Sequence, residues 1–305
     1  MENGGNYQIA ELSEFVDEAR LLRGQLGCGH LAPVRSSRVR RLASLHNVAG
    51  IAYSDYRSSH QTPGYGTDYT TTFRSGYYAA LWSRIERPLV EGILRPLGGP
   101  GRSCLDFACG TGRVTTVAGP LFGEVVGVDV SQSMLACARV PSNVKLLKAD
   151  LTVAPLSRRF DVVTAFRFFL NAEDTLRRDA LSAIHEHLND GGLLISNIHM
   201  NATSPMGLVC RGLNRFQGRV VRSTLSIHAY RQMLASNGFV VERVIGYGFL
   251  PRPGWLLPRL CETLIEPVEA ICRRVGVPAR FAQNFLVVAR RRLQAAALVL
   301  PPSSE

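Results

Sequence analysis

Residues 105–112, LDFACGTG, decide the fold of this 305-residue chain. The apolar run 104–107 meets two glycines spaced G-x-G, and a helix-like run over 113–117 follows. Glycine suits a turn that needs positive φ or a ligand lying against the backbone, and the amides that open a helix attract polar or anionic groups. The order strand, tight turn, helix therefore favours a nucleotide-like ligand, although an ordinary strand-to-helix turn has the same glycines.

Strand-like and helix-like patterns alternate on both sides of this turn, which predicts an α/β fold with a doubly wound, seven-stranded sheet. The expected strands are 102–107, 124–128, 144–147, 160–165, 192–198, 239–247 and 285–289. The expected helices are 114–121, 133–139, 175–188 and 227–237. A leucine-rich stretch, 254–275, predicts a helical insertion at about 250–280, between the last two strands.

The sequence divides into an N-terminal helical and tyrosine-rich cap region, 1–100, a nucleotide-binding domain, 101–292, and a frayed tail, 293–305. Apolar residues recur at steps of three and four over 9–26, which indicates an amphipathic helix. This helix is expected either to pack on its own domain or to form a dimer interface, so a homodimer is one possible assembly. Six tyrosines over 52–78 favour a lid or pocket wall over a surface loop. A further helix is expected over 77–94.

Composition limits the partners and the compartment. The net charge of +11 fits an anionic substrate, nucleic acid or lipid headgroups. The arginines are scattered, however, so there is no strong nucleic-acid signal. Seven cysteines without a C-x-x-C pair, a polar acidic N-terminus and the lack of ~18 successive apolar residues predict a soluble, cytoplasmic protein without a transmembrane segment. His185 and His187 would point to different faces of a helix, and we expect no metal site.

Two acidic residues stand at the ends of the second and third predicted strands. Asp129 could accept both hydrogens of a ribose diol, or it could simply cap the next helix. Asp150 would lie at the same edge of the sheet, within reach of an adenine amino group. After Gly112 the chain reads RVTTVAG, without the helix glycine of a dinucleotide fingerprint, so a dinucleotide is not the expected ligand.

The ordered segments LDFACGTG, VVGVDVSQSML, LLKADLTVAPL, FDVVTAFRFFLNAED and HLNDGGLLISN resemble class I S-adenosylmethionine-dependent methyltransferases. The resemblance covers 102–201, with weaker support to residue 290, and it implies S-adenosylmethionine as cofactor and an antiparallel last strand. The implied roles place the methionine part on the first motif and the adenosine on the next two. They assign cofactor binding to Asp106, Ala108, Gly110, Gly112, Asp129, Val130, Met134, Asp150, Leu151, Phe166 and Arg167. Ala108 stands where many relatives have the first glycine.

The acceptor end carries weaker signals. Residues 165–170, AFRFFL, lack the Asn/Asp-Pro-Pro-aromatic clamp of family members that act on base amines or glutamine amides. A small molecule, anionic or partly apolar, is therefore the predicted acceptor. A general base is needed only for a protonated acceptor. The candidates for it are His199, just past the fifth strand, and Tyr69 or Tyr77, although each also fits an ordinary polar or packing role.

The sequence thus predicts methyl transfer from S-adenosylmethionine to a small organic acceptor, with oxygen favoured and nitrogen or carbon open. Two alternatives stay open. The charge of +11 also fits an RNA or tRNA methyltransferase. A non-catalytic scaffold subunit that keeps the cofactor fold would use the first helix and the late insertion as interfaces.

Overall fold

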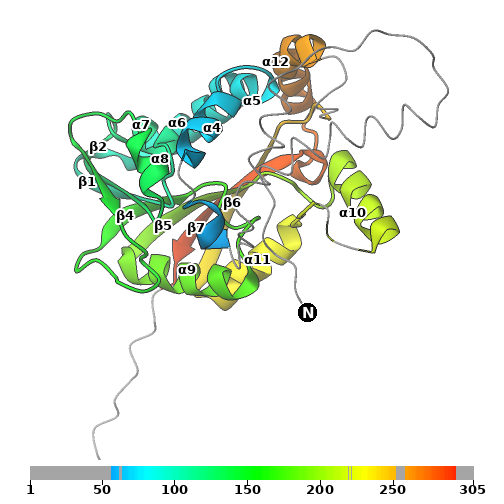
Figure 1. The fold of residues 1–305 in the computed structure, drawn as a ribbon. Coiled ribbons are helices and arrows are strands. Elements are labelled where there is room, and N and C mark those ends of the chain that lie inside the picture. Colours follow the sequence, from blue (N-terminus) through cyan, green and yellow to red (C-terminus); the bar gives the residue numbers. More distant parts are fainter. Residues whose placement is uncertain (1–55, 62–63, 219, 221, 252–257, 293–305) are drawn as a thin grey trace, which may run out of the picture.

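The computed structural model describes residues 56–61, 64–218, 220, 222–251 and 258–292, which form one sheet between layers of helices (Figure 1). The predicted helix 9–26, the tail 293–305 and the first residues of the insertion lie outside the described residues. The strands are β1 (Gly99–Phe107), β2 (Phe122–Asp129), β3 (Val144–Lys148), β4 (Phe160–Ala165), β5 (Leu188–Ile198), β6 (Phe239–Tyr247) and β7 (Asn284–Arg291).

The strand order is β3-β2-β1-β4-β5-β7-β6. Strands β1 to β5 pair in parallel, whereas β7 is antiparallel to both of its neighbours. The doubly wound seven-stranded sheet with an antiparallel last strand is therefore confirmed. The chain leaves β1 toward β2 on one side and returns to β4 on the other. Ligands of open α/β sheets bind at this switch point, outside the carboxyl ends of the strands.

Both faces of the sheet are buried, which explains the near-continuous apolar runs of the central strands. Leu105 and Phe107 pack on one face with α9 (Asp174–His187) and α11 (Ile227–Ser236). Cys104 packs on the other face with α6 (Arg87–Leu94) and α7 (Arg113–Ala118). Because successive side chains of a strand point to opposite faces, one strand supplies both cores.

The N-terminal part of the described chain forms a cap of short helices above the carboxyl edge of the sheet. Its elements are α3 (Tyr56–Ser59), α4 (Tyr65–Thr72), α5 (Tyr77–Ala80) and a π-helical segment, η1 (Leu81–Glu86). The single helix predicted over 77–94 is thus three successive elements, α5, η1 and α6. The tyrosine-rich segment, expected as a lid or loop, is largely helical.

Two further helices extend the sheet domain on the side of β5 to β7. Helix α10 (Pro205–Gln217) has no counterpart among the sequence-predicted helices, whereas α12 (Pro258–Arg274) falls in the predicted insertion and lies against α5 (Figure 1). The remaining elements are α8 (Gln132–Ala136), η2 (Arg95–Leu97) and η3 (Ala279–Phe281). Within the described residues, no helix is both long and apolar enough to cross a bilayer.

Candidate active site

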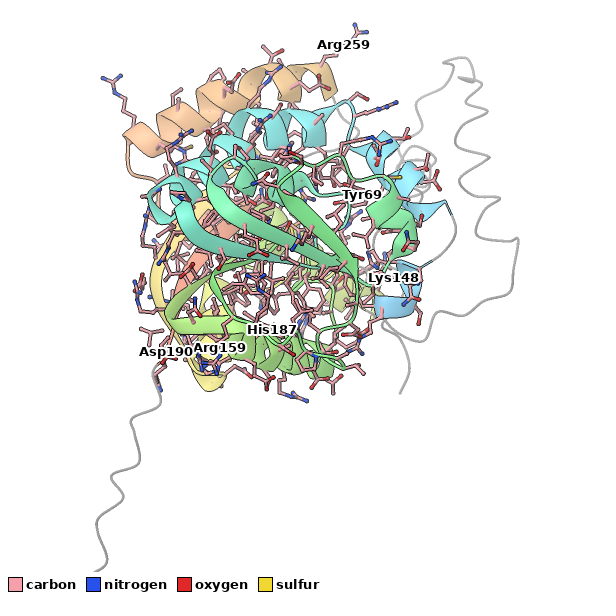
Figure 2. All side chains as sticks on the ribbon, turned by 90° about the vertical axis from the view of Figure 1, so that its left-hand side faces the viewer. Tyr69, Lys148, Arg159, His187, Asp190 and Arg259 are labelled. Atoms are coloured by element: carbon pink, nitrogen blue, oxygen red, sulfur yellow. The ribbon has the colours of Figure 1, made fainter. Side chains whose placement is uncertain are left out.

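A cleft of about 1060 Å³, its open mouth included, lies at the carboxyl ends of β1 to β4. Figure 2 shows the polarity of the sheet: Lys148, which ends β3, and Tyr69 of α4 lie on the same side of the molecule. Arg159, before β4, and Asp190, near the start of β5, lie at the opposite end. The cleft therefore occupies the edge where ligands of open α/β sheets bind.

Most of the sequence-predicted cofactor residues meet in this cleft. Ten of them line it: Asp106, Ala108, Gly110, Asp129, Val130, Met134, Asp150, Leu151, Phe166 and Arg167. Gly112 does not line the cleft. It has φ of 77° and precedes α7, so it serves the turn itself.

The turn after β1 is built from left-handed residues. Ala108 and Gly110 have φ of 54° and 57°, and Ala108 is one of two non-glycine residues with positive φ in the described chain. A Cβ at Gly110 would lie 3.0 Å from the Met134 side chain, so glycine keeps this side of the cleft open. The backbone of the turn is thus exposed to a ligand, as the G-x-G spacing predicts.

Asp129 is held in place by two backbone amides. Gly110 N and Ser131 N each donate to one of its carboxylate oxygens at 2.8 Å. Ser131, not Asp129, caps α8, because Ser131 Oγ accepts from Met134 N. Burial raises the pKa of Asp129. Each carboxylate oxygen retains a second lone pair, which fits the pair of hydroxyls on a ribose.

Asp106 lies deeper, below the turn. Thr115 Oγ1 and Thr164 Oγ1 donate to its two oxygens at 2.5 and 2.7 Å. Burial raises its pKa to about 6, and the two threonine hydrogen bonds work against this rise. A buried carboxylate at this depth favours a cationic group above it, such as the ammonium of an amino-acid tail.

Asp150 closes the other end of the cleft together with the cap. Arg57 Nε of α3 forms an ion pair with Asp150 Oδ2 at 2.8 Å, and Arg57 Nη2 donates to Thr152 Oγ1 at 2.6 Å. Thr152 Oγ1 in turn donates to Asp150 Oδ1. The cap is therefore tied directly to the acid that the resemblance assigns to the adenine edge.

The cap also docks on the loop that follows β2. Gly66 N donates to Ser133 Oγ at 3.0 Å, and Ser131 Oγ donates to the His60 carbonyl at 2.5 Å. A Cβ at Gly66 would lie only 2.1 Å from the Ser133 carbonyl oxygen, so no larger residue fits this approach. His60 and Tyr69 line the cleft. The tyrosine-rich segment forms a wall of the cleft.

Arg113, the first residue of α7, faces the cleft from below the cap. Its guanidinium lies 4.5 Å from the Phe73 ring and 5.1 Å from the Trp82 ring, and Nη2 donates to Tyr69 Oη at 2.7 Å. Within the described residues, Arg113 Nη1 is buried without a hydrogen-bond partner. A carboxylate in the cleft would supply one, which fits the tail of an amino-acid cofactor.

Glu86, at the end of η1, places a carboxylate in the cleft beside Arg167. It is 1% exposed, and Oε1 accepts from Asn197 Nδ2 at 2.8 Å and Tyr247 Oη at 2.7 Å. Oε2 has only a longer contact, 3.4 Å, to Arg167 Nη2. Glu86 lines the cleft, so Oε2 retains hydrogen-bonding capacity toward a ligand.

Arg167 adopts a strained backbone conformation beside Glu86. Its φ is 58°, and Asn197 Oδ1 accepts from its backbone amide at 2.7 Å while Tyr56 Oη donates to its carbonyl at 3.2 Å. A left-handed arginine held in place by its neighbours is typical of a functional site.

The three candidates for a general base do not come together. Only Tyr69 lines the cleft, and its hydroxyl accepts from Arg113. Tyr77 donates to the Leu250 carbonyl, away from the cleft lining. His199 lies outside the lining, and burial, with further contributions from Arg167 and Arg113, lowers its pKa to about 3. Such an imidazole is neutral at pH 7 and a weak base. The catalytic roles of all three stay predictions.

Sequence reasoning did not single out Arg113 or Glu86. Arg113 directly follows the glycine turn, where a cation opposes the helix dipole, and this conflict marks it as unusual. Glu86 precedes Leu89 and Val90 by three and four residues, so an acid shares the apolar face of its helix. Both features are visible in the sequence, but neither indicates which ligand the residue would bind.

The fold and the cleft lining together agree with the class I S-adenosylmethionine-dependent methyltransferase domain that the motif series resembles. The donor set fits this cofactor: acids at the adenosine end, small residues at the turn, and an unpartnered arginine nitrogen at the tail end. Among the described residues, no cluster of three or more His, Cys, Asp or Glu side chains could hold a metal ion.

The comparisons with known proteins agree with this class. Residues 104–192 match the family described as "Methyltransferase domain". The chain is 30% identical over 154 residues to the cypemycin N-terminal methyltransferase of a Streptomyces species, covering 49% of this chain and 54% of that protein. It is 28% identical over 154 residues to a 23S rRNA (uracil-C5)-methyltransferase of Alkalilimnicola ehrlichii, covering 43% of this chain and 34% of that protein.

A solved S-adenosylmethionine-dependent methyltransferase from Thermotoga maritima is similar in fold, with a TM-score of 0.50 and 19% identity over 74% of this chain and 95% of that one. The matches to the two curated relatives span about half or less of their length. Residues 104–192 therefore match a methyltransferase domain, and the solved neighbour agrees with the fold of the described chain.

Proposed function

We propose that the protein transfers a methyl group from S-adenosylmethionine to an oxygen of a small organic acceptor. The observation that carries this proposal is Glu86, a buried carboxylate at the acceptor end of the cleft. Its Oε2 has no hydrogen-bond partner closer than the 3.4 Å contact to Arg167. A hydroxyl of the acceptor would donate to this oxygen.

The position of the cap over the cleft favours a small acceptor over a macromolecule. Tyr56, Tyr69 and Trp82 line the cleft from above, and the cap is tied to the sheet domain through Arg57 and Gly66. A folded macromolecule would have to displace these contacts to reach the methyl group. The lining combines aromatic rings with a few charged groups, which is typical of a small-molecule pocket.

The charges at the acceptor end favour oxygen over an amine. Arg113 and Arg167 place two cations near Glu86, and both contribute to lowering the pKa of His199. Arg167 already balances the charge of Glu86, so a protonated amine would gain little from this carboxylate. A neutral hydroxyl needs no such charge to bind here.

The chemistry required of the chain is modest. The sulfonium supplies an activated methyl group and a neutral leaving group, and the protein must hold the acceptor oxygen in line with it. Positioning alone is worth up to ~7–11 kcal/mol. Glu86 Oε2 would accept the hydroxyl proton as the new carbon–oxygen bond forms, which contributes about 10² to 10⁴ in rate.

Two other functions lead to different products. The cypemycin enzyme is named for a peptide amino terminus and the Alkalilimnicola enzyme for an rRNA base, so these relatives do not agree on an acceptor. An RNA substrate would make binding steeply dependent on salt. A scaffold subunit would bind the cofactor without turnover.

Methyl-labelled S-adenosylmethionine distinguishes these functions. The purified chain is incubated with separate small-molecule, RNA and protein fractions, and the labelled product is identified by mass spectrometry. We expect label in the small-molecule fraction, as a methyl ether or ester. Label confined to RNA or protein, or on nitrogen or carbon, would contradict the proposal.

A further inference from the structure

Helix α10 exposes an apolar face that no part of the described chain covers. Leu208 is 55% exposed, Val209 54% and Phe216 91%. Only Gly207 and Cys210 are buried on this helix. Figure 1 shows α10 standing away from the sheet. Single exposed apolar residues are common, but a row of them on one helix marks an interaction surface.

The same helix carries positive charge and no negative charge. Residues 205–223 contain four arginines and neither Asp nor Glu. Arg211 and Arg215, four residues apart, are exposed and lie along one edge of the apolar face. In the described part of the chain, neither forms an ion pair.

The helix is held firmly in this position. Ser204 caps it by accepting from Gly207 N, and a Cβ at Gly207 would lie 1.9 Å from the Asn201 carbonyl oxygen. At the other end, the Asn214 side chain bonds both the amide and the carbonyl of Arg222. Arg222 is thereby held against the end of α10, and Val220, between the helix and Arg222, is 56% exposed.

We propose that α10 docks on a lipid bilayer that contains anionic phospholipids. An amphipathic helix with apolar residues on one face and arginines at its edge binds such an interface by burying the apolar side chains and pairing the cations with headgroups. A symmetric dimer through α10 would bring Arg211 and Arg215 toward their own copies with no acid on the helix to compensate.

Helix α12 is a poorer candidate for this role. It also exposes apolar residues, including Leu260 and Ile271, but it carries the acids Glu262 and Glu266 on another face, beside Arg84 of η1. These acids lower the net positive charge of the helix, so its attraction to an anionic surface is weaker than that of α10. The sequence pattern suggested the leucine-rich insertion as the amphipathic segment. The structure shows that the exposed apolar face with arginines and no acids belongs to α10.

Vesicle flotation of the full chain tests this proposal. Vesicles of phosphatidylcholine alone are compared with vesicles that also contain phosphatidylglycerol. We expect binding to the anionic vesicles only, weakened by salt. Phe216→Glu and the double variant Arg211→Gln, Arg215→Gln should each lower the partition coefficient by about tenfold or more, because each arginine and each buried side chain contributes measurably. Ile271→Glu on α12 is the matched control and should bind like wild type.

Other results of the same experiments would contradict the bilayer proposal. The proposal is overturned if the full chain binds neither kind of vesicle, or if the α10 variants bind as well as wild type. Gel filtration of the same proteins identifies another occupant: a dimer that Phe216→Glu converts to a monomer, without vesicle binding, would make this face a contact between copies. Circular dichroism confirms that each variant is folded.

Discussion

Arg113 begins a helix, where a positive charge opposes the helix dipole, and it is nevertheless buried against three aromatic rings. Burial lowers its pKa, so its charge is costly unless an anion pairs with it. Tyr69 accepts from Nη2, and Nη1 is buried with no hydrogen-bond partner among the described residues. We infer that Arg113 binds the carboxylate of the cofactor's methionine tail.

Arg113→Met should therefore weaken S-adenosylhomocysteine much more than 5′-methylthioadenosine, which lacks the amino-acid tail. Loss of a charge-assisted hydrogen bond is worth about 1.5–3 kcal/mol, or roughly 10- to 100-fold in the dissociation constant. Isothermal titration of both ligands measures the difference. An equal change for the two ligands would show that Arg113 only supports the cap.

Glu86→Gln should lower turnover by about 10² or more, because an amide is not a proton acceptor. The affinity for S-adenosylhomocysteine should change little, since Glu86 lies at the acceptor end of the cleft. Steady-state kinetics with the acceptor found by labelling, together with titration of the cofactor product, check both points. Unchanged turnover would rule out Glu86 as the base.

His199 predicts a pH effect on stability. Its pKa is about 3 in the folded chain and ordinarily 6.5, so between these values only the unfolded state binds the proton. The contribution to stability is present above pH 6.5 and is lost as the pH falls toward 3. By pH 5 the loss of stability, relative to neutral pH, amounts to about 2 kcal/mol. Urea unfolding at about pH 7.5 and 5 should show a smaller loss for His199→Gln than for wild type. Equal losses would contradict the assigned burial.

At the scale of elements, the cap and the cofactor loop act as one unit because Gly66 allows α4 to approach α8. Gly66→Ala would place a methyl group 2.1 Å from the Ser133 carbonyl. Forced overpacking costs ~1–3 kcal/mol, so we expect the affinity for S-adenosylhomocysteine to fall by about tenfold or more. Gly92→Ala is the matched control, because its Cβ would meet no atom within 4 Å. Equal affinities for the two variants would show that the cap does not support cofactor binding.

Helices varied in how well the sequence predicted them. Helix α9 was predicted within one residue at each end, because its apolar periodicity is regular. Helix α10 was missed although Ser204, Pro205 and Gly218 mark its ends. Its exposed apolar face resembles neither a core helix nor a loop, so periodicity alone gave no clear signal.

At the scale of the whole molecule, the seven strands and the doubly wound sheet followed from the alternation of patterns, and the antiparallel last strand followed from the resemblance, whereas the strand order came from the structure. The sequence also predicted that Asp106, Asp129 and Asp150 would lie close together, because they stand at strand ends and sheet geometry brings such residues to one edge. All three line the cleft. The carboxylate at the end of the cleft near Arg167 was not predicted, because Glu86 comes from the cap, and its place beside Arg167 depends on how the cap packs.

The central claim is that this cleft binds S-adenosylmethionine, with Asp129 holding the ribose. Isothermal titration of S-adenosylhomocysteine into wild type and Asp129→Asn tests it most directly. We predict one site per chain in wild type and an affinity about 10- to 100-fold lower in the variant, because a charged hydrogen-bond acceptor is lost. No binding to wild type, or equal affinity in the variant, would contradict the claim.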